Sequence, residues 1–400
     1  MIKKRLKNGL TVIYEKRDGK SVVIELCVKT GSNNESGHER GISHFLEHLI
    51  FEGTKNRSAD QIANEVESVG GEFNAATTHE RTAFWTKVPA KHFDRALNVL
   101  ADMFLNPLFS IESINKEKKV VLDEINLITD DPKFHQFVLF LRTMFARHPT
   151  RNPIYGSKES ILAVTRNDVV DYFNRWYVPN NMILTIVGGV DNPLAKIQRY
   201  FSKMKPRKLP ALKFPKDRIA RNRHGVERRK TMQSYLVLGF NAATRDHPDS
   251  FVFDVIRSIL ARGQSGRLFR EIRTKRGLVY DVGALYDASK SYAYFAAYLS
   301  TNKSNIETCK NLILDEIDKL KDISARDLAE AKTYLEGEFL LLNEDNSRHA
   351  DNMCMWEAFD RAEIVNRYLS EIKKVSKNDI ARIVRKYLKN YAMSVIEQKG

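Results

Sequence analysis

The 400-residue sequence lacks long apolar runs and has few cysteines. No stretch approaches the ~20 consecutive apolar residues that a membrane-spanning helix needs. The basic N-terminus runs directly into a strand-like segment, without the apolar core of a secretory signal. The three cysteines, Cys27, Cys309 and Cys354, are too widely spaced for a zinc knuckle or a disulfide framework. We therefore expect a protein of the reducing cytoplasm that does not enter membranes.

The sequence also lacks the aromatic-interleaved basic motifs of RNA-binding proteins, although its formal net charge is +15. Lysine and arginine are spread along the whole chain. The densest basic run, residues 205–230, is interleaved with prolines, as in an extended linker. We therefore expect no nucleic-acid partner. A basic nucleic-acid-binding protein is the less favoured alternative, and it would show strongly salt-dependent affinity.

The order of the expected elements repeats along the chain. A length of 400 residues exceeds one ordinary core, and the basic, proline-containing linker at 206–226 separates repeats at 1–205 and 227–400. Each repeat contains strands and two successive long helices, and the segment 164–169 is echoed by 375–380. The sequence predicts an α+β fold of two homologous repeats, each a mostly antiparallel sheet packed with helices.

The motif His44-Phe45-Leu46-Glu47-His48 stands out against this background. Two histidines four residues apart lie about one turn apart on the same helix face, so both imidazoles can meet one metal ion. Glu47 lies close to that face, where it could take a proton from water at the metal. H-x-x-E-H is the inverse of H-E-x-x-H and follows the same chemical logic. On the motif alone, a buried helix whose histidines only satisfy core hydrogen bonds is an equally good interpretation.

The second repeat provides an internal test of this motif. Aligning the helix that ends near Gly53 with the helix that ends near Gly263 places a different set of residues opposite the motif: Asp254, Arg257 and Ser258. Histidines that only fill a core would have less reason to differ so completely between the copies. The alignment therefore favours a metal site in the first repeat and a non-catalytic second repeat.

A catalytic zinc site needs a third protein ligand and keeps a fourth position for water. Glu117 and Glu124 are seven residues apart on an expected long helix and share one of its faces. A carboxylate on a partly buried face needs a partner, and a metal ion is a suitable one. On the residues alone, however, a surface helix with charge pairs such as Lys119 with Asp123 is the favoured interpretation.

With these motifs the chain resembles a known family, the inverzincin zinc peptidases of the pitrilysin and insulin-degrading-enzyme group. The likeness is greatest to the processing-peptidase branch, which includes mitochondrial processing peptidase beta-type subunits and bacterial homologues. It covers essentially all 400 residues, including the length, the repeat and the linker. Its signature block is matched by three stretches: Gly31-Ser32 with Glu35, Gly41 to His48, and Phe51 to Thr54.

The resemblance implies the roles of the metal-site residues. The family's third ligand lies about 75 residues after the second histidine, at the end of an E-x6-E pair, and 75 residues lie between His48 and Glu124 here. His44, His48 and Glu124 would then hold one Zn2+ per chain. Glu47 would be the catalytic base, and Glu117 would be a catalytic-site group that orients the ligands.

The resemblance also implies two substrate-binding regions. The stretch from Gly70 to Thr82 resembles the family's edge strand, with Asn74 and Ala75 beside an extended substrate that adds as another strand. An ordinary hairpin is equally compatible with these residues. Arg273 and Tyr280 resemble the pair that holds the substrate main chain, although a surface role for Arg273 is favoured without the family.

Together these features predict a zinc-dependent endopeptidase that hydrolyses unfolded peptides or presequence-like segments inside an enclosed chamber. In related enzymes four such repeats build a clamshell, and this chain supplies two of them, or half. We therefore expect a homodimer in which Arg273 and Tyr280 complete the partner's site in trans. The alternative is a non-catalytic peptide-binding or assembly subunit of the same fold.

Overall fold

The computed structural model describes residues 1–217, 219 and 221–399. The chain forms two compact units that are not continuous in sequence. The first unit contains Met1–Asn126, Pro153–Lys213 and Leu342–Val365, and the second contains Leu127–Asn152, Phe214–Leu341 and Asn366–Gly400. The sequence boundaries expected for the repeats stay a prediction, but the compact units do not follow them, because two segments are exchanged.

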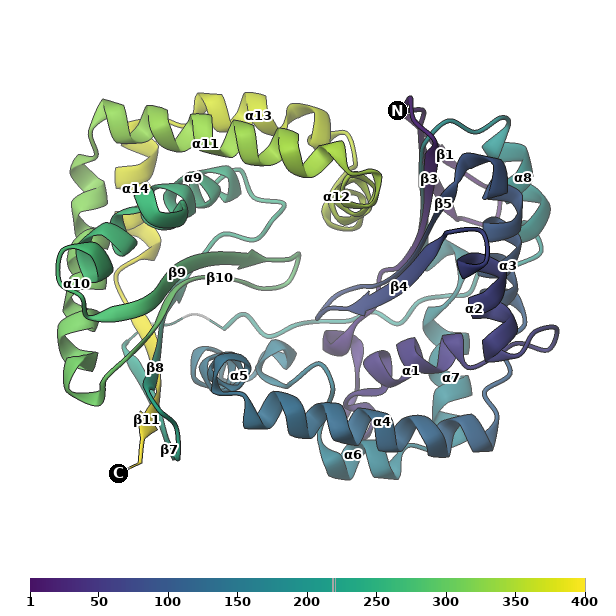
Figure 1. Ribbon diagram of the computed structural model, residues 1–400, viewed down its shortest axis with the longest axis horizontal. Helices are drawn as coiled ribbons and strands as arrows, with labels where there is room; N and C mark the ends of the chain where they lie inside the picture. Colours follow the sequence, from purple (N-terminus) through teal and green to yellow (C-terminus); the bar gives the residue numbers. More distant parts are fainter. Residues whose placement is uncertain (218, 220, 400) are drawn as a thin grey trace. The chain divides into compact units, whose positions relative to one another are not determined.

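The first unit is built on a six-stranded sheet in the order β1-β2-β6-β3-β5-β4. Figure 1 labels β1, β3, β4 and β5 of this sheet. Most neighbours are antiparallel, whereas β2 and β6 are parallel. The strands are β1 (Ile2–Arg5), β2 (Thr11–Glu15), β3 (Ser21–Val28), β4 (Glu72–Thr77), β5 (Thr82–Pro89) and β6 (Met182–Val187). β4 is an edge strand, and only β5 pairs with it in this sheet.

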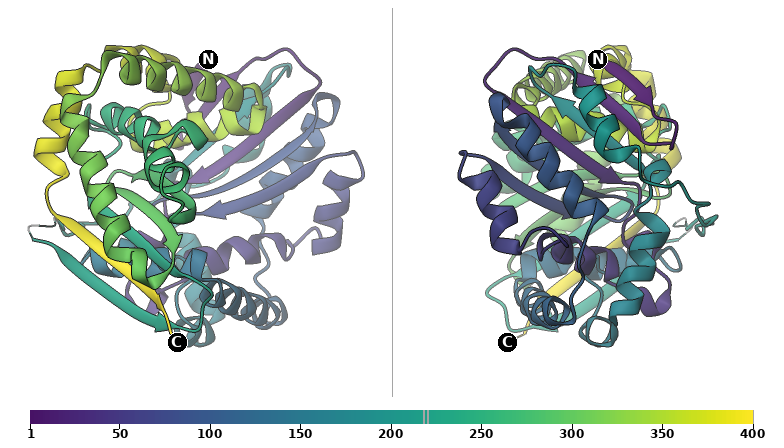
Figure 2. Two further views of the ribbon diagram at one scale, coloured as in Figure 1. Left: turned by 60° about the vertical axis from the view of Figure 1, so that its left-hand side comes forward. Right: turned by 90° about the vertical axis from the view of Figure 1, so that its right-hand side faces the viewer.

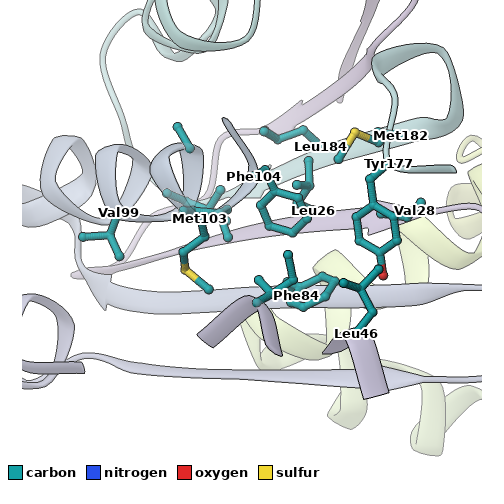
Figure 3. Packing of buried hydrophobic residues seen from close by; sticks show 14 of the residues in the cluster. Leu26, Val28, Leu46, Phe84, Val99, Met103, Phe104, Tyr177, Met182 and Leu184 are labelled. Atoms are coloured by element: carbon teal, nitrogen blue, oxygen red, sulfur yellow. The ribbon is translucent and has the colours of Figure 1, made fainter. Parts of the chain in front are cut away.

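Helices pack on this sheet because alternate strand residues point to opposite faces. Leu26 and Phe84 belong to the face whose core includes Phe104 of α3, as Figure 3 shows. The unit's helices are α1 (Ile42–Phe51), α2 (Ala59–Glu67), α3 (Phe93–Leu105), most of α4 (Ile111–Asp130), α6 (Lys158–Ala163), α7 (Arg166–Trp176), α8 (Pro193–Phe201) and α12 (Asn346–Phe359).

The second unit is built on a five-stranded sheet in the order β7-β11-β8-β10-β9. The strands are β7 (Arg223–Arg229), β8 (Ser234–Asn241), β9 (Val279–Ala288), β10 (Ala293–Thr301) and β11 (Tyr391–Gln398). The helices are α5 (Pro132–Met144), α9 (Ser250–Ala261), α10 (Ile306–Asp318), most of α11 (Ala325–Glu344), most of α13 (Ile364–Lys374) and α14 (Lys377–Tyr387). Figure 2 shows these elements from two further directions.

Each sheet is packed by a helix from the other half of the sequence. α12 packs against β3 and β6 of the first unit, and α5 packs against β7, β8 and β11 of the second. In β3, seven of eight residues are consequently buried, as in sheets covered on both faces. This burial includes Glu25, whose carboxylate lies 3.8 Å from the Arg81 guanidinium, which in turn lies 2.6 Å from Asp351 of α12.

The two units confirm the predicted fold class of two sheets packed with helices. The expected sequence echo also has the same local structure in both units. Thr165 and Ser376 each open a helix with a capping box, whose partners are Asp168 and Asp379. These four residues satisfy the first amides of α7 and α14 in the same way.

The linker expected at 206–226 overlaps the connection between α8 and β7 but extends into β7 at its C-terminal end. No helix or strand of the described residues lies between the end of α8 at Phe201 and the start of β7 at Arg223. The last residues of the expected linker therefore belong to β7, and residues 218 and 220 lie outside the described part of the chain. Within that part, no helix combines the length and the hydropathy that crossing a membrane requires.

Candidate metal centre

The helix that carries the motif, α1, is fixed at its N-terminus by Glu35. The Glu35 carboxylate accepts hydrogen bonds from the backbone amides of Gly41 at 2.8 Å and Ser43 at 2.9 Å. These amides would otherwise lack partners at the helix start. Gly41 adopts a positive φ of 91°, which a residue without a side chain accommodates readily. Burial raises the pKa of Glu35 to about 8. Sequence reasoning placed Glu35 in a signature block but missed this role.

The three expected ligands converge within the first unit. His44 Nε2 lies 3.5 Å from Glu124 Oε2, and His48 Nε2 lies 3.6 Å from the same oxygen. One donor atom from each of the three residues lies within 4.8 Å of the other two. A tetrahedral zinc with bonds of about 2.1 Å separates its ligands by about 3.4 Å. Two nitrogens and one carboxylate oxygen at these separations fit a zinc ion.

The pKa values of the two histidines are shifted in opposite directions. Burial lowers the pKa of His44 to about 4, so its ring is neutral. Burial also opposes the charge on His48, but hydrogen bonds to Glu117 and Glu124 outweigh it and raise the pKa of His48 to about 9. A proton on His48 therefore supplies positive charge beside Glu117 and Glu124, where a bound metal cation would otherwise supply it.

Glu117 is a buried partner of the site rather than a surface residue. It is 6% exposed, and its Oε2 lies 3.1 Å from His48 Nδ1. The hydrogen bond with His48 lowers the pKa of Glu117. The surface-helix interpretation of the sequence is wrong for Glu117, because the α4 face that carries it packs toward α1.

Glu47 projects from α1 toward the edge strand. Burial raises the pKa of its carboxyl group, which is the direction expected of a general base poised near neutral pH. The Thr77 hydroxyl donates to Glu47 Oε2 at 2.5 Å. Sequence reasoning missed Thr77, because a threonine at the end of a strand gives no sign of a partner 30 residues earlier in the chain.

The predicted substrate strand, β4, lies beside α1. Asn74 is exposed, and its side-chain oxygen accepts a hydrogen bond from the backbone amide of Ala75 at 2.8 Å. That amide therefore does not contribute to the ladder with β5. On the other face of the strand, the ring of Phe73 packs 5.3 Å from that of Phe51 in α1. The structure thus places Asn74 and Ala75 on the strand whose last residue contacts Glu47.

Arg273 and Tyr280 lie in the second unit and contact each other. The Arg273 guanidinium lies 4.7 Å from the ring centres of both Phe269 and Tyr280. Arg273 belongs to a π-helical segment, Phe269–Thr274, and such segments are frequent at functional sites. Tyr280 is 74% exposed. The pair expected from the resemblance is therefore assembled, with an exposed aromatic ring beside a cation.

The second unit replaces the metal ligands with protein ion pairs. Asp254, opposite His44 in the sequence alignment, lies 2.9 Å from Arg245, and Arg257, opposite Glu47, lies 2.5 Å from Glu338. Ser258, opposite His48, donates its hydroxyl to a backbone carbonyl. Among the described residues, His44, His48 and Glu124 form the one group suited to hold a metal ion. In the second unit, arginine side chains thus supply the positive charge beside the carboxylates of α9 and α11.

The chain has two units, each a sheet packed with helices, and the first unit carries a donor set suited to hold a metal ion. Residues 11–158 match the model of Insulinase (Peptidase family M16), and residues 163–335 match that of the Peptidase M16 inactive domain. An uncharacterized zinc protease of Rickettsia felis is 31% identical over 98% of this chain and 96% of its own length. An uncharacterized zinc protease of Bacillus subtilis is 27% identical over 98% of this chain and 97% of its own length. The chain belongs to peptidase family M16.

Solved structures share the whole fold. A protease from Helicobacter pylori superimposes with a TM-score of 0.94, at 21% identity, over 99% of both chains. A peptidase M16 inactive domain from Pseudomonas fluorescens superimposes with a TM-score of 0.90, at 18% identity, over 100% of this chain and 98% of that one. These likenesses establish the two-domain fold.

Proposed function

We propose that this protein is a zinc-dependent endopeptidase that hydrolyses peptide bonds in unfolded peptides or presequence-like segments within an enclosed chamber. One observation carries the proposal: the donor atoms of His44, His48 and Glu124 converge beside a carboxylate, Glu47, that belongs to the same helix turn. A zinc ion held there would polarise a peptide carbonyl and acidify a water molecule. We propose one ion per chain.

The side chains of the site divide the remaining work. Glu47, whose pKa is raised by burial, accepts a proton from the attacking water and then donates it to the leaving amine. Glu117 engages Nδ1 of His48, so the opposite ring nitrogen, Nε2, is the one directed to the ligand cluster. Both functions require fixed side chains, and both residues are held by hydrogen bonds.

The free edge of β4 supports the proposed substrate class. An extended peptide can add to an open strand edge through backbone hydrogen bonds, which do not depend on side-chain identity. The Ala75 amide is directed to that edge, where the Asn74 side chain now takes the place of a substrate carbonyl. We propose that Asn74 and Ala75 bind the substrate backbone there and that Arg273 with Tyr280 forms a second contact. An unfolded segment can extend along this edge without first losing structure of its own, so unfolded segments are preferred.

The variant Glu47→Gln tests this function directly. The amide keeps the size of the side chain but cannot accept the proton, so we expect zinc content to be retained and hydrolysis to fall at least about 100-fold. The assay is digestion of a mixed peptide library with product sequencing, with and without a chelator. Glu52→Gln, which alters an exposed ion pair at the end of α1, is the matched control and should keep wild-type rates.

The alternative is a non-catalytic peptide-binding or assembly subunit of the same fold, as the likeness to an M16 inactive domain suggests. The complete donor set and Glu47 favour an enzyme, because a purely assembling subunit has no use for them. Zinc binding by the wild-type protein without chelator-sensitive hydrolysis of any peptide in the library would support the alternative. Substantial residual hydrolysis by Glu47→Gln would refute the role of Glu47.

A further inference from the structure

We propose that Thr77 is a positioning residue, which holds the Glu47 carboxylate in place and connects it to the strand that receives the substrate. This inference rests on the proposed peptidase function and adds a residue that carries no metal and touches no substrate side chain. Thr77 is the last residue of β4, and its hydroxyl donates to Glu47 Oε2 at 2.5 Å. Its backbone amide also donates to the same carboxylate.

The backbone pattern of β4 shows why Thr77 reaches the base. Amides of successive residues in an antiparallel strand point alternately toward one neighbour and away from it. The Thr78 amide donates to Arg81 across the β4–β5 turn, whereas the Ala75 amide donates to the Asn74 side chain. The backbone amides of the even-numbered residues of β4 therefore point toward β5, and those of Ala75 and Thr77 point toward the open edge.

This alternation gives the edge strand two adjacent functions. The Ala75 amide is available to a substrate carbonyl, and the next outward-facing amide, that of Thr77, is already engaged with Glu47. A peptide that adds along β4 is thereby placed in register with the base, because the same strand binds both. The register would be lost if Glu47 were free to adopt another rotamer, since its side chain has three rotatable bonds.

The hydroxyl is the part of Thr77 that can be removed without changing its shape. Thr77→Val keeps the β-branched side chain, and Thr77→Ser keeps the hydroxyl. A matched control is Thr82→Val, because Thr82 lies directly opposite Thr77 on β5 and donates its hydroxyl to the Thr30 carbonyl instead. Each zinc-loaded variant is assayed for zinc content, thermal unfolding, kcat and KM with peptides that the wild-type protein cleaves.

We expect Thr77→Val to bind one zinc per chain and to lose about 10- to 100-fold in kcat, with a change in KM below about threefold. Thr77→Ser should recover most of the rate, and Thr82→Val should keep wild-type kcat. A readout independent of activity is the crystal structure of each metal-free variant. The Glu47 carboxylate should leave its wild-type position in Thr77→Val and keep it in Thr77→Ser.

Two results would overturn the inference while leaving the peptidase function intact. One is wild-type kcat in Thr77→Val, and the other is equal loss in Thr77→Val and Thr77→Ser, which would indicate a purely structural role. An unmoved Glu47 carboxylate in the Thr77→Val crystal structure would also contradict it. By contrast, absence of hydrolysis by the zinc-loaded wild-type protein would refute the proposed function, and this inference with it.

Discussion

Nδ1 of His48 lies 3.1 Å from Oε2 of Glu117, and Glu117 is almost completely buried. This contact joins α1 to α4 and selects which ring nitrogen of His48 is available to a metal. The second carboxylate of α4, Glu124, lies on the opposite side of the same ring, 3.6 Å from Nε2. Because the two glutamates lie on one face of α4, the His48 ring has Glu117 on one nitrogen as an orienting partner and Glu124 near the other nitrogen as a candidate fellow ligand.

Replacing Glu117 with Gln should weaken zinc binding without removing a ligand. An amide is a weaker acceptor than a carboxylate and does not favour the required imidazole tautomer, so we expect a loss of about 10- to 100-fold in zinc affinity. Competition with a chromophoric chelator measures this loss. Glu112→Gln, an exposed residue in the first turn of α4, is the control. Equal affinities for the two variants would contradict the orienting role.

Zinc binding should release protons near neutral pH. The pKa of His48 is raised to about 9 in the metal-free protein, above its ordinary value near 6.5, so the ring is protonated at pH 7. Zinc requires the neutral imidazole, so at least one proton should leave per ion bound. Calorimetry at pH 7 in buffers of different ionisation enthalpy measures the number. A binding enthalpy that does not depend on the buffer would contradict the prediction.

The same shift has a consequence for the stability of the metal-free protein. Because the folded-state pKa of His48 lies above the unfolded value, its interaction with the glutamates contributes fully below about pH 6.5 and is lost as the pH rises through about 9. In Glu117→Gln this component of the pH dependence should be smaller. Thermal unfolding between pH 6 and pH 10 with a chelator present compares the two proteins.

Proline substitutions in β4 should separate substrate binding from folding. Ala75→Pro removes an amide that points to the open edge, a position where proline is tolerated, so we expect a folded protein with a raised KM for peptides. Ala76→Pro removes an amide directed toward β5 and leaves its partner carbonyl unpaired, so it should lower the free energy of unfolding by about 1–3 kcal/mol. Peptide kinetics and thermal unfolding distinguish the two. Equal destabilisation by both substitutions would contradict the assigned direction of the amides.

Arg257, which aligns with Glu47 of the first repeat, should stabilise the second unit through its ion pair with Glu338. Its guanidinium lies 2.5 Å from Glu338, and its side chain is 28% exposed. Arg257→Met leaves Glu338 without this partner, and we expect a loss of about 1–3 kcal/mol of unfolding free energy. The control is Arg326→Met, because the Arg326 side chain is 88% exposed and its ion pair with Glu330 should contribute little to stability. A smaller loss for Arg257→Met than for Arg326→Met would refute this role.

Assembly can be tested by mixing two inactive variants. We propose that the protein is a homodimer in which Arg273 and Tyr280 of one chain complete the metal site of the other. Glu47→Gln and Arg273→Ala should each be inactive alone. After exchange of subunits, random pairing restores one intact site in half of the dimers, or about a quarter of wild-type activity. No recovery beyond either variant alone would exclude completion in trans.

The sequence by itself determined the metal-binding helix and much of the fold class. Side chains four residues apart on a helix share a face whatever the surroundings, so His44 and His48 predict a common metal from local geometry alone. Glu124 was one of two candidates on its helix, and only the family resemblance identified it as the third ligand. Strand and helix periodicity, with the echo of Thr165 in Ser376, predicted the two sheets and their repetition.

The tertiary structure decided which distant groups surround that helix. Glu35 binds two backbone amides at the start of α1, and Thr77 contacts Glu47 from a strand 30 residues later in the chain. No periodicity in the sequence records either contact. The sequence pattern also did not show that α12 packs on the first sheet and α5 on the second. Nor did it show the ion pair between Arg257 and Glu338, which the second unit has in place of a metal site. Local patterns determine what a helix can bind, whereas burial and charge pairing between distant segments determine whether its side chains are held ready to do so.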